Sequence, residues 1–117
     1  MKNQQLNTVR CCLIPELREQ LRQQANETAT RLSRSVARLT SCELQACLEY
    51  GEEVAYQQEL AQTLFYLQHC RNTLERCIGG RSATLRYRWP DGKVSRTTFR
   101  RSGINQIKVS GLDLPAR

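Results

Sequence analysis

Residues 83–100 read ATLRYRWPDGKVSRTTFR, and a turn divides this stretch into two runs. Apolar and basic side chains alternate along the first run, which is the two-residue period of a half-buried strand. The apolar members are Leu85, Tyr87 and Trp89, and the basic members are Arg86 and Arg88. Pro90-Asp91-Gly92 is typical of a tight turn whose glycine adopts a left-handed conformation. The stretch therefore predicts a β-hairpin whose aromatic face packs on the rest of the protein.

Two further strands are expected outside the hairpin. Residues 104–109 predict a third strand beside it, and residues 111–117 predict a loose tail. Residues 8–13 also alternate, and their apolar face is expected to be buried. That face consists of Val9, Cys11 and Leu13. This first strand could pair with a second copy of the chain or with the C-terminal strands, and the sequence leaves both open.

Hydrophobic spacing between these strands predicts three helices, at residues 15–28, 33–50 and 52–78. A turn is expected near residues 29–32, because the weak helix formers Asn26, Thr28 and Thr30 lie in or just before this segment. Gly79-Gly80 are expected to end the third helix. Its apolar stripe is long for a chain of this size, which predicts burial against another helix or a second subunit.

These elements together predict an α+β protein. Residues 1–80 would form an N-terminal strand and a three-helix, dimeric core. Residues 81–117 would form a basic β-hairpin or three-stranded sheet, packed on that core.

The positive charge is confined to one part of the chain. The net charge is +2 over residues 1–50, −2 over residues 51–78 and +7 over residues 79–117, and the total is +7. A charge concentrated in one segment indicates a polyanionic partner, and nucleic acid is the main candidate. The alternative is a solvated surface that only keeps the protein soluble.

Residues 8–50 resemble a ribbon-helix-helix DNA-binding domain, in which two chains pair one strand each into a ribbon that enters the major groove. The resemblance rests on a short strand, then Ile14-Pro15-Glu16-Leu17, then helices. It implies that Arg10 faces the bases, beside Thr8 and Cys12, and that Ser33 and Arg34 hold a phosphate at the start of the second helix. A strand followed by two ordinary helices is the alternative.

Catalysis and metal binding find little basis in the sequence. Most of the six cysteines fall on apolar faces, which predicts buried thiols. A zinc site would need close pairs of ligands, such as two separated by about two to four residues, and the sequence does not repeat such a pair. No nucleophile–base pair can be identified around the single histidine, His69. An enzyme, a metal site, a cofactor and a small-molecule substrate are therefore not expected.

The resulting hypothesis is a small non-enzymatic DNA-binding protein, of the regulatory or accessory type that a mobile element could encode. It would act as a homodimer, with DNA favoured over RNA. The residues expected at the nucleic acid are Arg10, Arg34, Arg86, Arg88, Lys93, Arg96, Arg100 and Arg101. The alternative is a protein–protein interaction module that modulates a nucleic-acid-processing enzyme of the host, and a third possibility is a structural oligomer.

A cytoplasmic location is expected for this protein. The first residues, MKNQQ, lack the apolar block of a secretion signal, and no apolar run has the length of a membrane-spanning helix. No membrane partner is expected for the same reason.

Overall fold

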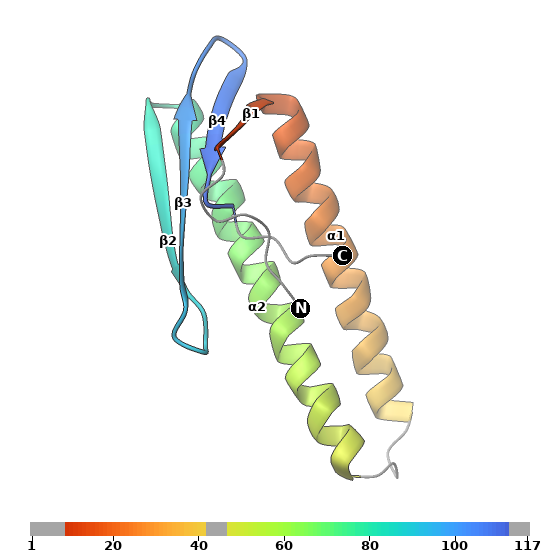
Figure 1. Cartoon of the computed structure of the whole chain (residues 1–117). Helices are drawn as coiled ribbons and strands as arrows, with labels where there is room; N and C mark the ends of the chain where they lie inside the picture. Colours follow the sequence, from red (N-terminus) through yellow and green to blue (C-terminus); the bar gives the residue numbers. More distant parts are fainter. Residues whose placement is uncertain (1–8, 42–46, 113–117) are drawn as a thin grey trace.

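The computed structural model describes residues 9–41 and 47–112. Two long helices lie side by side in it, and a sheet covers one end of the pair (Figure 1). The helices are α1 (Ile14–Ser41) and α2 (Cys47–Ile78). The strands are β1 (Val9–Leu13), β2 (Ser82–Arg88), β3 (Val94–Arg101) and β4 (Gln106–Ser110). All pairings are antiparallel, in the order β1-β4-β3-β2.

The α+β class is confirmed, but the predicted three helices and three-stranded sheet are wrong. The described residues contain two helices and a sheet of four strands. The fourth strand is β1. It pairs with β4 of its own chain, which is one of the two pairings that the sequence left open.

The predicted hairpin and its turn are confirmed. Strands β2 and β3 pair along their length, and the backbone N–H of Gly92 donates to the carbonyl of Trp89 at 3.0 Å. Gly92 has a φ of 93°, the left-handed region in which a residue with a side chain would be strained. The predicted third strand is β4, paired with β3.

Helix α1 runs without interruption through the turn that was expected at residues 29–32, and the helix start expected at Ser33 is also wrong. The hydroxyls of Thr28 and Thr30 donate to the carbonyls of Gln24 and Asn26, at 2.8 and 2.9 Å, so both threonines are accommodated within the helix. The apolar spacing ends early because two positions on the buried stripe are polar. They are Thr28 and Ser35.

Helix α2 begins at Cys47, so the break expected at Gly51 lies inside a helix. The residues that join the two helices, 42–46, lie outside the described part. The apolar stripe expected on this helix includes Leu60, Leu67 and Leu74, which are buried, and Tyr56, which is 42% exposed. The helix ends directly before Gly79-Gly80, as predicted. Much of the apolar stripe that suggested a dimer is thus covered within one chain. The homodimer itself stays a prediction.

The faces of β1 are the reverse of those predicted. Val9 is 60% exposed and Leu13 40% exposed, and Cys11 is also exposed. Cys12 packs against the core, because it lies opposite the buried Ile107 of β4 and shares its side of the sheet. Pairing with β4, rather than the polarity of the side chains, decides which face is buried.

A single hydrophobic core joins the helices to the sheet. Its largest buried side chains include Leu17, Leu21, Tyr66, Phe99 and Ile107, so both predicted segments, 1–80 and 81–117, contribute to it. Leu85, Tyr87 and Trp89 pack against this core, as the alternation in β2 predicted. None of the helices described is both apolar enough and long enough to cross a bilayer.

Two of the predicted buried thiols are confirmed. Cys70 and Cys77 are buried on α2. Cys11, expected to be buried, is exposed. Cys42 and the side chain of Cys47 lie outside the described part of the chain.

Candidate nucleic-acid interface

The sheet has one side against the helices and one side facing away from them, here called the outer face (Figure 1). Along β2 and β3, alternation sends apolar or small side chains inward, and every basic side chain of the two strands except that of Arg101 outward. Strand β4 follows the same pattern, with Ile107 and Val109 buried and Lys108 exposed. The exposed cations of the outer face are Arg86, Arg88, Arg96, Arg100 and Lys108.

Strand register places these cations directly opposite one another. Arg86 lies opposite Arg96 across β2 and β3, and Arg100 lies opposite Lys108 across β3 and β4. Side chains in directly opposed positions have Cβ atoms about 5 Å apart, and like charges there destabilise a sheet. Two such pairs on one face therefore lower the stability of the free protein.

No carboxylate offsets this charge on the sheet. The sequences of the four strands contain neither aspartate nor glutamate. Within residues 9–41 and 47–112, no side chain of the five cations makes a hydrogen bond or an ion pair with another described residue. The five are consequently available to an external anion.

Part of the hairpin extends beyond β4 as a two-stranded ribbon. Strand β4 pairs with β3 only at residues 98–101, so residues 94–97 pair with β2 alone. This ribbon, residues 85–88 and 94–97, carries Arg86, Arg88 and Arg96 on its outer face.

Aromatic packing fixes the ribbon to α2. The ring centroids of Tyr66 and Trp89 lie 5.1 Å apart, and those of Tyr87 and Trp89 lie 4.9 Å apart. The hydroxyl of Tyr87 donates to Gln62 Oε1 at 2.6 Å, and the Trp89 indole N–H donates to Ser95 Oγ at 2.7 Å. Burial raises the pKa of Tyr87. A rigid support of this kind holds the outward arginines in place.

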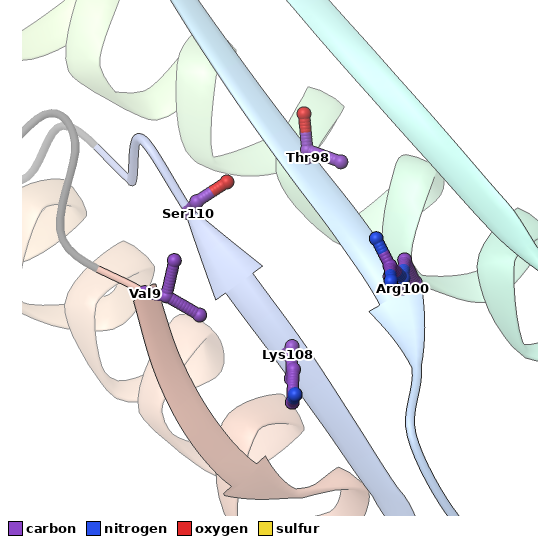
Figure 2. A pocket seen from close by; sticks show the side chains of 5 residues that line it. All are labelled: Val9, Thr98, Arg100, Lys108 and Ser110. Atoms are coloured by element: carbon purple, nitrogen blue, oxygen red, sulfur yellow. The ribbon is translucent and has the colours of Figure 1, made fainter.

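A hollow of about 240 Å³ opens on the outer face between β3, β4 and β1. Figure 2 shows the side chains around it, with the two cationic groups at one end and the hydroxyls and a valine at the other. They are Val9, Thr98, Arg100, Lys108 and Ser110.

Four of the eight sequence-predicted residues come together on the outer face: Arg86, Arg88, Arg96 and Arg100. Lys93 lies next to the turn at the tip of the hairpin, where its backbone N–H donates to Asp91 Oδ1 at 2.9 Å. Lys108 was missed. The alternation of Gln106–Ser110 would have placed it on the outer face had the third strand been assigned a register.

Three predicted residues lie elsewhere. Arg101 is on the helix side of β3, where its guanidinium donates to the carbonyls of Ile78 and Ile104. Arg10 lines a different hollow, which also contains Glu16. Arg34 lies in the interior of α1, so no free helix N-terminus exists there to bind a phosphate.

The described residues hold no group of three or more potential metal ligands. No protein-family model, curated protein or solved structure matches this chain.

Proposed function

We propose that this protein is a small, non-enzymatic DNA-binding protein of regulatory or accessory type, which contacts DNA phosphates through its basic β-hairpin and the rest of the outer face. The observation that carries the proposal is the direct opposition of like charges on strands that contain no carboxylate. Phosphates placed over these pairs would convert a repulsion into favourable contacts.

Arginine is the main cation of this surface, with four arginines to one lysine. The planar guanidinium donates two parallel hydrogen bonds to a phosphate, a geometry that an ammonium group does not offer. This composition favours recognition of a phosphate backbone over a charge that serves solubility alone.

Two features favour duplex DNA over single-stranded nucleic acid. Proteins that bind single strands stack bases on exposed aromatic rings. The aromatic side chains of the described strands, Tyr87 and Phe99, both face the helices, as does Trp89 just beyond β2. In addition, a two-stranded ribbon is an element that the major groove, about 12 Å wide, admits.

The proposal is tested by fluorescence anisotropy with a labelled mixed-sequence duplex. The charge-pair variant Arg86→Ala/Arg96→Ala is expected to bind roughly 30-fold more weakly, taking about 1 kcal/mol for each lost phosphate contact. Its stability should match or exceed that of the wild type, because the substitution removes a like-charge pair. Urea unfolding of the same samples therefore separates lost binding from lost folding.

The matched control is Arg31→Ala/Arg34→Ala, which removes two exposed arginines from α1. Its affinity should fall by less than about threefold, the effect of net charge alone. Equal losses in both double variants, or no duplex binding by the wild type at low salt, would contradict the proposal. In the second case an acidic protein surface becomes the partner to seek.

A further inference from the structure

We propose that the hollow shown in Figure 2 is a discrete site for one phosphate group of the nucleic-acid backbone, together with its sugar. The site rests on the proposed function and deepens it, because it names a second point of contact outside the ribbon. Its polar groups are the side chains of Thr98, Arg100, Lys108 and Ser110.

The sheet brings these groups together in two adjacent rows. Thr98 lies opposite Ser110, which lies opposite Val9. Arg100 lies opposite Lys108 in the row two residues along. Neighbouring strands are about 4.8 Å apart and alternate residues about 7 Å apart along a strand, so four polar side chains surround a space of phosphate dimensions.

The chemistry of the four groups matches a phosphate. Two cations meet its charge, and two hydroxyls can donate to its remaining oxygens. The hydroxyl of Thr98 lies 3.3 Å from that of Thr84, and when Thr84 donates in this hydrogen bond the Thr98 proton is free for a ligand. A phosphodiester has enough acceptor oxygens for donors of both kinds.

Val9, a residue that is 60% exposed, gives the site an apolar wall on β1. The volume of about 240 Å³ is about eight times the share of one water in the liquid, more than a phosphate group alone requires. The hydrocarbon part of the sugar beside the phosphate can lie against the valine, which removes apolar surface from water.

The site is separate from the ribbon. Arg100 is four residues from Arg96 on β3, which corresponds to about 13 Å along the strand. A backbone that contacts both positions is therefore held at two points on the outer face.

The experiment uses substitutions that remove hydroxyls without changing charge. Thr98→Val/Ser110→Ala is expected to weaken duplex binding roughly fivefold, the range for two hydroxyl hydrogen bonds to a phosphate. The slope of log affinity against log salt should stay unchanged, because no cation has been lost. Lys108→Gln, in contrast, should reduce the magnitude of that slope by about 0.9.

The matched control removes the same two kinds of hydroxyl from exposed positions of α1, as Thr30→Val/Ser33→Ala. It should bind like the wild type. If Thr98→Val/Ser110→Ala also binds like the wild type while Arg86→Ala/Arg96→Ala loses affinity, the phosphate site is wrong and the proposed function stands.

A second measurement does not depend on DNA. Inorganic phosphate is titrated into the ¹⁵N-labelled protein at constant ionic strength, with chloride as the reference anion. Saturable shifts centred on the amides of residues 98, 100, 108 and 110 are expected, and their absence would overturn the site. Because inorganic phosphate is the probe, this titration shows whether the hollow binds a phosphate group even if the protein binds no duplex.

Discussion

Arg100 and Arg101 are neighbours on β3 with unlike roles. Arg100 is exposed on the outer face, opposite Lys108. Arg101 points to the helix side and donates to the carbonyl of Ile78, at the end of α2, at 3.0 Å. It also donates to the carbonyl of Ile104, before β4, at 2.9 Å. A carbonyl at a helix end has no partner within the helix, so Arg101 joins α2 to the sheet.

Arg101→Ala is therefore expected to lower the free energy of unfolding by about 1–3 kcal/mol, since two hydrogen bonds from a charged donor are lost. Duplex binding by the folded variant should keep the salt dependence of the wild type. Urea unfolding followed by anisotropy titration checks both. Unchanged stability with a weaker salt dependence would mean that Arg101 contacts the nucleic acid instead.

Local patterns in the sequence predict those elements whose signals are local. The hairpin, its turn and the end of α2 depend on alternation, on Gly92 and on Gly79-Gly80, and all three are confirmed. The alternation in residues 83–89 predicted that Arg86 and Arg88 share a face. Arg96 and Arg100 were predicted as cations of the returning strand, with no face assigned to them. Local patterns do not contain the register between strands, which brings Lys108 beside Arg100.

The predictions were wrong for features that depend on tertiary contacts, namely the continuity of α1 and the faces of β1. Helix α1 continues through the expected turn, and its buried side includes Thr28 and Ser35. Because both side chains are polar, the spacing of apolar residues does not show that these positions are buried. The faces of β1 follow from its pairing with β4, a strand almost 100 residues away, and no local rule gives that register.

The continuity of α1 is tested by Ala29→Gly, at an exposed position in the middle of the expected turn. Glycine in the interior of a helix costs about 1 kcal/mol relative to alanine, and the free energy of unfolding should fall by that amount. A turn at residues 29–32 would tolerate glycine with almost no loss. Urea denaturation distinguishes the two, with Ala37→Gly, nearer the end of the same helix, as a comparison.

Across the molecule, one core joins both ends of the described chain, and several titratable groups belong to it or pack against it. Burial raises the pKa of Cys12, Cys77 and Tyr87. Between the ordinary pKa of a thiol or phenol and its raised pKa in the folded protein, the unfolded chain has released a proton that the folded protein still holds. The contribution of each group to stability is therefore complete below the ordinary pKa and is lost as the pH rises through the pKa of the folded state.

The melting temperature should accordingly fall as the pH is raised above about 9, where unfolded thiols and then phenols ionise. Thermal unfolding followed by circular dichroism between neutral and alkaline pH measures the effect. Cys77→Ala should make the alkaline fall shallower, because one of the three groups is gone. A melting temperature that stays constant across this range would contradict the loss of stability that the raised pKa values predict at alkaline pH.

Five cations on one face of the sheet are proposed to contact phosphates, and the salt dependence of duplex binding measures how many of them do so. Each neutralised phosphate contributes about −0.9 to the slope of log affinity against log salt, so contacts from all five predict a slope of about −4.5. Anisotropy titrations of the wild-type protein over a series of salt concentrations give this slope. A value between about −3.5 and −5 agrees with the outer face as the interface. A slope near zero, or no binding at the lowest salt, would contradict it.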